Sequence, residues 1–328
     1  PVMVFLMHLT RKGAYKKRFP RKKKTDRSDG ILFPAITEDR STSEAGKAAL
    51  CAAITAGSPI VPKAAAKARS ERNWRFGYKK HFKAMVEASI ASPEAALAVS
   101  EAGADFLHST FEFRRPGNDE KKSFEEKTIV SFKDEMKRKD TCFVGTMRVE
   151  GEGKAAEEFM VPYKSRGVEN PLKGDEVKKL ADRWAKYGTI EPDAAASLKA
   201  VVDHPEWLGK GLKDHYFVLI GAGSAMGPFL KLMELGANVI ALDIPGAWEK
   251  KGRPSVWRRL MEVARKSAGK IIFPLNKKAK DCKNDDDIVK AAGANLMTQP
   301  ADLKNWLLNL PEIKNKKNHV VIGNYTYL

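Results

Sequence analysis

Short apolar runs alternate with amphipathic stretches over the last third of the chain. The apolar runs, each as long as a buried strand, are 217–220, 239–242, 270–274, 294–297 and 319–322. The stretches between them have helical periodicity or helix-capping residues, and predict helices at 228–235, 255–267, 285–292 and 301–308. Strands and helices that alternate in this way predict an α/β fold with a doubly wound parallel sheet, for which we expect the strand order 3-2-1-4-5.

The pattern before this sheet is less regular and predicts a smaller α+β region. Helices are expected at 43–56, 76–90, 93–103, 124–138, 173–187 and 192–202, and a strand at 104–108. Two further strands, 141–149 and 158–163, are expected to form a hairpin around Gly151-Glu152-Gly153. The predicted parts of the chain are therefore a basic, largely extended N-terminal arm (1–62), an α+β region with helices and a hairpin (63–205), and the doubly wound domain (206–328).

Three glycines follow the first strand of the predicted sheet at a spacing that suits phosphate binding. Gly221, Gly223 and Gly227 have G-x-G-x-x-G spacing: the first permits a tight turn, the second a close approach of pyrophosphate, and the third close helix packing. The next helix offers free N–H groups at its start. Asp243 ends the second strand, where a carboxylate can accept hydrogen bonds from an adenosine ribose. The residues expected to form a cofactor site are Gly221, Gly223, Ser224, Ala225, Met226, Gly227, Asp243 and Thr298.

Polar residues also follow the last two predicted strands. Thr298 and Gln299 come after the fourth strand, and Asn324 and Tyr325 after the fifth. The carboxyl ends of strands in such a sheet converge on one crevice, so we expect these side chains on the nicotinamide or substrate side of the cofactor.

The stretch from Phe217 to Asp243 resembles the NAD(P)-binding Rossmann superfamily, which includes short-chain and amino-acid dehydrogenases. The likeness extends over the predicted sheet, although only its first β-α-β unit is specific. A fainter similarity to uncharacterised Rossmann-domain proteins of unicellular algae extends to 95–115 and implies no activity. The resemblance implies a dinucleotide cofactor. We expect NAD, because a carboxylate would repel the 2′-phosphate of NADP; nearby Lys250, Lys251 and Arg253 keep NADP possible.

The chain lacks the tyrosine and lysine pair that short-chain dehydrogenases use as general acid and base. No tyrosine has a lysine four residues after it, so a lysine-assisted tyrosine mechanism is unsupported. His108, His204, His215 and His319 are alternative acid/base candidates, but no catalytic or metal-binding spacing accompanies them. Catalytic residues stay unassigned, and no metal site is expected.

Composition limits the class of protein. The chain has 328 residues, 43% of them hydrophobic, and no apolar run long enough to cross a bilayer, so we do not expect an integral membrane protein. Cys51, Cys142 and Cys282 lie far apart and form no disulfide or zinc-binding pattern. This cysteine usage indicates a reducing, intracellular compartment.

The formal net charge of +18 is concentrated near the N-terminus. Residues 1–30 carry ten Lys/Arg against two Asp, and residues 63–83 carry eight against one Glu. We expect residues 1–30 to be a solvated or partner-ordered arm, with contact to nucleic acid or an anionic membrane as the alternative.

Aromatic residues alternate with cations between Arg72 and Lys83. Phe82, Val86 and Ile90 follow at helical spacing, which predicts that they face the core while the cations face solvent. The alternative is that the aromatics stack on bases or dock on an acidic protein.

Three classes of function remain. The first is an NAD(P)-binding, oxidoreductase-like protein of unknown substrate. The second is a non-catalytic Rossmann-type accessory subunit of a large macromolecular assembly, docked by its basic N-terminal arm. Residues 1–83 would then contact a protein assembly or a polyanionic surface. The third, a nucleic-acid-associated protein, depends only on the basic segments.

Overall fold

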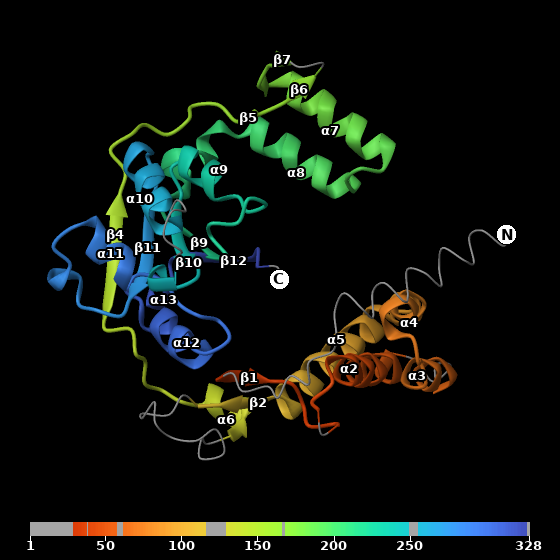
Figure 1. The fold of residues 1–328 in the computed structure, drawn as a ribbon. Helices are drawn as coiled ribbons and strands as arrows, with labels where there is room; N and C mark the ends of the chain where they lie inside the picture. The colour runs from red at the N-terminus through yellow and green to blue at the C-terminus, as the bar shows by residue number, and fades with distance from the viewer. Residues whose placement is uncertain are drawn as a thin grey trace, which may run out of the picture. The chain divides into compact units, whose positions relative to one another are not determined.

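The computed structural model describes residues 29–37, 39–57, 62–115, 129–165, 168–248 and 255–326 (Figure 1). The chain divides into two compact units, 1–138 and 139–328. The domain boundary expected at 205/206 therefore lies inside the second unit.

The first unit combines a group of helices with a small antiparallel sheet. The helices are α2 (Thr42–Gly57), α3 (Pro62–Arg69), α4 (Trp74–Ser89), α5 (Pro93–Thr110) and α6 (Phe132–Met136). The strands, in the order β1-β2-β3, are Gly30–Leu32, Glu112–Arg114 and Ile129–Ser131. Helix α2 is central because it packs against α3, α4 and α5, burying Leu50 and Ile54.

The expectation of an extended arm over 1–62 is wrong for its second half. Strand β1 pairs with β2, and α2, which confirms the helix expected at 43–56, lies in the core of the first unit. An alanine-rich helix with buried Leu50 and Ile54 gains its stability from tertiary packing, which the local sequence does not reveal. Residues 1–28, with most of the basic arm, lie outside the described residues.

The helix that begins at Pro93 does not end at Gly103. Ser92 caps it as expected, its Oγ accepting a hydrogen bond from Ala95 N at 3.1 Å. The helix then continues through the expected strand 104–108. A Cβ atom on Gly103 would meet only Ala53 Cβ, at 3.8 Å, so this glycine lies where α5 packs on α2. The described part of the helix expected at 124–138 is also different, since it comprises β3 and the short α6.

Helix α4 presents to solvent the stripe that was expected to face the core. Phe82, Val86 and Ile90 are exposed. A second series at helical spacing, which includes Trp74, His81 and Ala88, packs inward instead. Two competing apolar series exist on this helix, and the small Ala88 side chain is the one that allows close packing beside Val99 of α5.

The second unit is built on a five-stranded, mostly parallel sheet, which confirms the α/β class (Figure 1). Its order is β12 (His319–Asn324), β9 (His215–Ile220), β10 (Asn238–Leu242), β11 (Lys270–Leu275) and β4 (Gly145–Glu150). The first four strands are parallel, and β4 is an antiparallel edge strand. The order 3-2-1 is thus as expected for β11, β10 and β9.

Helices cover both faces of this sheet. One face packs on α9 (Phe229–Glu234), α10 (Val256–Lys266) and α11 (Asp285–Ala291), and the other on α12 (Pro300–Asn309) and α13 (Pro311–Lys314). Alternate residues of β10 separate the two cores: Val239 and Ala241 belong to the first, Ile240 and Leu242 to the second. This two-sided burial explains why the strand is apolar from Val239 to Leu242.

The fourth strand expected at 294–297 does not form, so the expected order beyond 3-2-1 is wrong. Strand β12 occupies the place next to β9. Gly293 has a left-handed backbone (φ 96°), and Ala294 N donates to Asp243 O at 2.9 Å. The side chain of Gln299 then accepts a hydrogen bond from Asn295 N at 2.9 Å. These bonds turn the chain into α12 before a strand can extend.

The hairpin expected between 141–149 and 158–163 is also wrong. Strand β4 pairs with β11 instead. The N–H groups of Gly151, Glu152 and Gly153 donate to carbonyls of Gly269, Arg265 and Ser267, respectively. A Cβ on Gly151 would lie 1.9 Å from Ser267 O, so this glycine permits a close approach to the end of α10 rather than a hairpin turn.

The segment between β4 and β9 carries a helix pair that the sequence predicted. Helices α7 (Asp175–Tyr187) and α8 (Pro192–Asp203) confirm the helices expected at 173–187 and 192–202, and they pack on each other. Two short ribbons precede them: β5 (Met160–Val161) with β8 (Leu172–Lys173), and β6 (Lys164–Ser165) with β7 (Val168–Glu169). Short 3-10 helices lie at Pro205–Trp207, Gly209–Leu212, Gly246–Trp248 and Ala279–Asp281.

Candidate functional site

The glycine turn follows the last residue of β9 and is hydrogen-bonded to the carboxyl end of the neighbouring parallel strand, β10. The N–H groups of Gly221 and Ala222 both donate to Leu242 O, at 2.8 and 3.0 Å. Gly221 has φ 84°, and a Cβ there would lie 3.1 Å from the backbone of Tyr325. A residue with a side chain would be strained at this position, so the first glycine has the conformational role that its spacing predicted.

Asp243 meets this turn directly. One carboxylate oxygen, Oδ2, accepts a hydrogen bond from Gly223 N at 2.6 Å, and Oδ1 accepts one from Ile244 N at 2.8 Å. A Cβ on Gly223 would lie 3.0 Å from Asp243 Oδ2 and 2.5 Å from Val256 Cγ1. The fold therefore brings together two residues that the sequence placed in one site. Each carboxylate oxygen has a second lone pair with which it can accept another donor.

Arg259 is a member of this site that the sequence did not identify. It lies on α10, and its Nη2 donates to Gly223 O at 2.7 Å. Its neighbour Arg258 pairs with Asp286. Both arginines lie on an amphipathic helix, and nothing in their local sequence separates the one that reaches the glycine turn from the one that does not. The expected cations Lys250, Lys251 and Arg253 lie outside the described residues.

Most N–H groups of the turn are engaged within the chain. Ser224 N donates to Gly221 O at 3.0 Å, Gly227 N to Ser224 O at 3.1 Å, and Met226 N to Ser224 Oγ at 3.3 Å. Among the described residues, Ala225 N–H has no acceptor, and Ala225 and Met226 are exposed. Helix α9 is six residues long and follows Pro228, which has no N–H. The turn thus offers an anion fewer donors than its glycine spacing suggested.

The other expected site residues are divided between the turn and its surroundings. Tyr325 N donates to Ile220 O at 2.8 Å, and the Tyr325 ring lies 3.5 Å from the Cβ position of Gly227. Asn324 instead uses its Oδ1 to accept hydrogen bonds from Thr326. Thr298 N donates to Asn295 O at 3.2 Å, within the turn before α12. Gln299 bonds to Asn295 and Cys142. Of the four, only Tyr325 contacts the glycine turn through described residues.

Cys142 lies beside Gln299 and is held in a protonated state. Its backbone N donates to Asp302 Oδ1 at 2.8 Å, and Gln299 Nε2 lies 3.3 Å from its Sγ. Partial burial of the thiol and the negative charge of Asp302 raise the pKa of Cys142 to about 11. A thiol with this pKa is a weak nucleophile at neutral pH.

Alkylation of Cys142 is expected to be slow and steeply dependent on pH. With a pKa of about 11, about one thiol in a thousand is ionised at pH 8. The iodoacetamide rate at Cys142, followed by peptide mass spectrometry, should rise about tenfold per pH unit from pH 8 to 10. The same peptide in urea, where burial and Asp302 no longer act, should react at least about tenfold faster at pH 8. A plateau in the native rate near pH 9 would contradict this protonation state.

Three of the histidines considered as acid/base groups belong to the second unit, and they do not reach the glycine turn. His215 and His319 stack with ring centroids 4.8 Å apart, at the first residues of β9 and β12. The glycine turn follows the last residue of β9, so these rings lie at the opposite edge of the sheet. His204 stacks on Trp207 and bonds to Glu206. None of these three is placed to act on a ligand at the turn.

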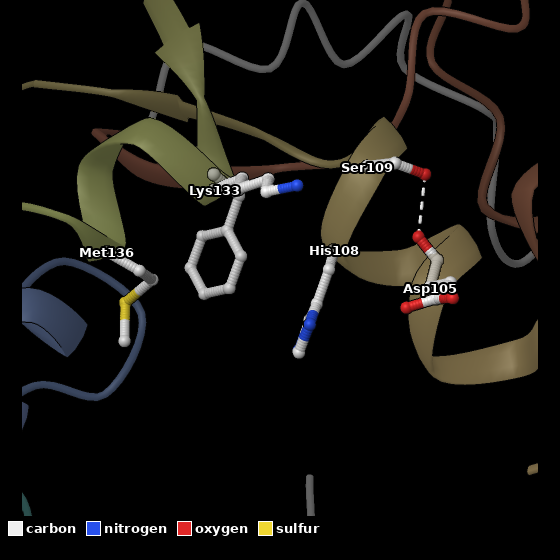
Figure 2. Close-up of a pocket in the computed structure, with 6 residues that line it drawn as sticks. Asp105, His108, Ser109, Lys133 and Met136 are labelled. Atoms are coloured by element: carbon white, nitrogen blue, oxygen red, sulfur yellow. Dashed lines mark hydrogen bonds between the residues drawn. The ribbon is translucent and has the colours of Figure 1, made fainter. Parts of the chain in front are cut away.

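A separate pocket of about 480 Å³ lies between α5 and α6 in the first unit (Figure 2). It is lined by Asp105, His108, Ser109, Phe132, Lys133 and Met136. Its Asp, His and Ser are the residue types of a nucleophilic triad. However, Ser109 Oγ donates to the backbone carbonyl of Asp105 at 2.6 Å, one turn back on its own helix. Among the described residues, no hydrogen bond joins the Ser109 hydroxyl to the His108 imidazole, so this structure does not show the bonded arrangement of a triad.

Comparison with protein-family models, curated proteins and solved structures finds no match for this chain. Within the described ranges, no group of three or more His, Cys, Asp or Glu side chains could hold a metal ion. None of the described helices has the length and apolar character needed to traverse a lipid bilayer.

Proposed function

We propose that the second unit is a Rossmann-type domain that binds a dinucleotide, NAD(H) in preference to NADP(H), in an oxidoreductase-like protein whose substrate is not assigned. One observation carries the proposal: Asp243 Oδ2 lies 2.6 Å from Gly223 N, where β9 and β10 end side by side. In open α/β sheets, ligands bind in the crevice outside the carboxyl ends of the strands. The glycine turn and the acidic residue are at that edge.

The residues around the turn can be assigned to parts of such a ligand. The free lone pairs of Asp243 would accept the ribose hydroxyls. Ala225 N–H, the Ser224 hydroxyl and the Arg259 guanidinium would face the phosphates. When bound, a nicotinamide cofactor supplies hydride transfer. We assign no group of this chain to proton transfer, because His215 and His319 of the second unit lie at the opposite edge of the sheet.

Calorimetric titration of the full chain with NADH and NADPH tests the proposal. We expect NADH to bind and NADPH to bind more weakly, because the carboxylate of Asp243 repels a 2′-phosphate. AMP is a useful third ligand, since it contains the adenosine ribose without the pyrophosphate. Absence of binding by all three would overturn the proposal.

A second candidate is a non-catalytic Rossmann-type accessory subunit of a large assembly. The observation that favours it is that the turn's N–H groups, apart from that of Ala225, are bonded within the described chain, and that α9 begins after Pro228. Glycines can be needed for packing alone, as the contacts of Gly223 with Val256 and Asp243 illustrate. In such a subunit, the contacts with the assembly would come from residues 1–83, which are strongly basic.

A further inference from the structure

One face of α4 in the first unit is apolar and open to solvent. Phe76, Phe82, Val86 and Ile90, the last directly after the helix, are 70%, 46%, 49% and 74% exposed, respectively. Single apolar residues are common on protein surfaces, but three on one side of α4 and a fourth at its C-cap form a patch, and such patches mark interaction sites.

Cations lie among these apolar side chains. A rotation of about 100° per residue places Arg75, Lys79 and Lys83 on the same half of the helix as Phe82 and Val86. All three cations are exposed. The face therefore combines apolar and positive groups rather than separating them.

Few acidic groups offset these cations. The only acidic residue of α4 is Glu87, and its carboxylate lies 3.6 Å from Lys83 Nζ in an exposed pair. Glu71, before the helix, is bonded to Lys80 at 2.6 Å, to Asn73 N at 2.9 Å and to His81 at 3.2 Å, and these bonds hold its pKa down to about 2. An exposed pair such as Lys83 with Glu87 is weak, so Lys79 and Lys83 are the cations of this face best placed to attract an external anion.

The orientation of this face is fixed by the opposite side of the helix. Trp74 and Met85 pack in a cluster with residues of α2 and α3, and Ala88 packs with Ala53 and Val99. His81 is buried and stacks on Trp74. Helix α4 therefore cannot rotate to bury Phe82, Val86 and Ile90 without losing these contacts.

We propose that this face of α4 docks on an anionic lipid bilayer. A bilayer interface takes both kinds of group at once, with apolar side chains entering the acyl boundary and Lys or Arg reaching the phosphate headgroups. The charge complements such a surface, since residues 63–83 carry eight Lys/Arg against one Glu. Single-stranded nucleic acid is a poorer fit, because Val86 and Ile90 offer bases no ring to stack on. This docking is independent of the dinucleotide site.

Co-sedimentation of the full chain with vesicles tests the proposal. We expect binding to phosphatidylcholine vesicles that contain phosphatidylserine, no binding to phosphatidylcholine alone, and weaker binding as salt is raised. Each Lys or Arg near an anionic leaflet is worth about a fivefold change in affinity. The double change Lys79→Glu, Lys83→Glu reverses two charges, a change of four units, and should therefore weaken binding more than about a hundredfold. Phe76→Ser with Ile90→Ser should weaken it at least about tenfold.

Matched changes on the second unit provide the control. Lys316→Glu with Lys317→Glu makes the same change in net charge in an exposed turn, and should retain most of the binding. All variants keep residues 1–30, so a loss of binding in the α4 variants alone separates the contribution of α4 from that of the basic arm. Unchanged melting temperatures would confirm that the variants are folded. The proposal is overturned if the unaltered chain does not bind vesicles that contain phosphatidylserine. That result would favour an acidic protein or nucleic acid as the partner of this face. Binding of the α4 variants at the level of the control would overturn it as well.

Discussion

Replacing Trp257 by alanine is expected to lower the free energy of unfolding of the second unit by about 4 kcal/mol. Trp257 is fully buried, and its ring lies 4.7 Å from that of Phe273 in β11. Its Nε1 also donates to Ile244 O at 2.9 Å. The substitution leaves a large cavity and removes the hydrogen bond to Ile244 O, and both effects destabilise.

Equilibrium urea unfolding measures this loss, and two further variants separate its causes. Trp257→Phe keeps an aromatic ring beside Phe273 but removes the bond to Ile244, and should cost about 1–2 kcal/mol. Trp207→Ala serves as the control, because Trp207 is 45% exposed and stacks on His204, which is itself exposed. Its cost should stay below about 1 kcal/mol. Equal losses of unfolding free energy for Trp257→Ala and Trp207→Ala would contradict this prediction. Trp257 would then not hold α10 against the loop after β10.

The core of the candidate site could be predicted from the sequence because its geometry follows from chain direction. When two consecutive strands are parallel neighbours, their carboxyl ends meet, so Gly223 and Asp243 had to lie close together once β9 and β10 paired. Gly221 was predictable for a similar reason, since the tight turn requires its left-handed backbone.

Other features depend on tertiary choices that the local sequence leaves open. The residues 294–297 are apolar enough for a strand, but Gly293 and the Gln299 side chain turn the chain first. On α4, two apolar series compete, and packing against α2 and α5 selects the one with small Ala88. No local sequence pattern identifies Arg259 as a site residue. Its role depends on the tertiary packing that brings its guanidinium to Gly223 O.

The contacts of Gly223 decide which substitution tests the dinucleotide site. Filling the expected pyrophosphate space with Gly223→Val is not a clean test, since a side chain there would meet Val256 Cγ1 at 2.5 Å and displace Asp243. That variant would disturb packing and binding together. Asp243→Asn is a cleaner test, because asparagine has nearly the same size as aspartate and Gly223 is not substituted.

Asp243→Asn is expected to weaken NADH binding by about tenfold to a hundredfold and to reduce the preference over NADPH. Hydrogen bonds to charged groups contribute about 1.5–3 kcal/mol, and asparagine lacks both the charge and one of the two acceptor oxygens. The substitution also removes the charge that repels a 2′-phosphate, while Arg259 stays beside Gly223. Calorimetry with both cofactors measures the two effects separately.

Asp281→Asn is the matched control, because Asp281 is exposed and lies in a short 3-10 helix after β11. It should leave both affinities unchanged. Arg259→Ala completes the series: it should weaken both cofactors to a similar extent, since the guanidinium would face the pyrophosphate that NADH and NADPH share. If Asp243→Asn melts near the unaltered protein and binds both cofactors as tightly, Asp243 serves only to hold the glycine turn through Gly223 N. The accessory-subunit function would then be the better explanation of the same geometry.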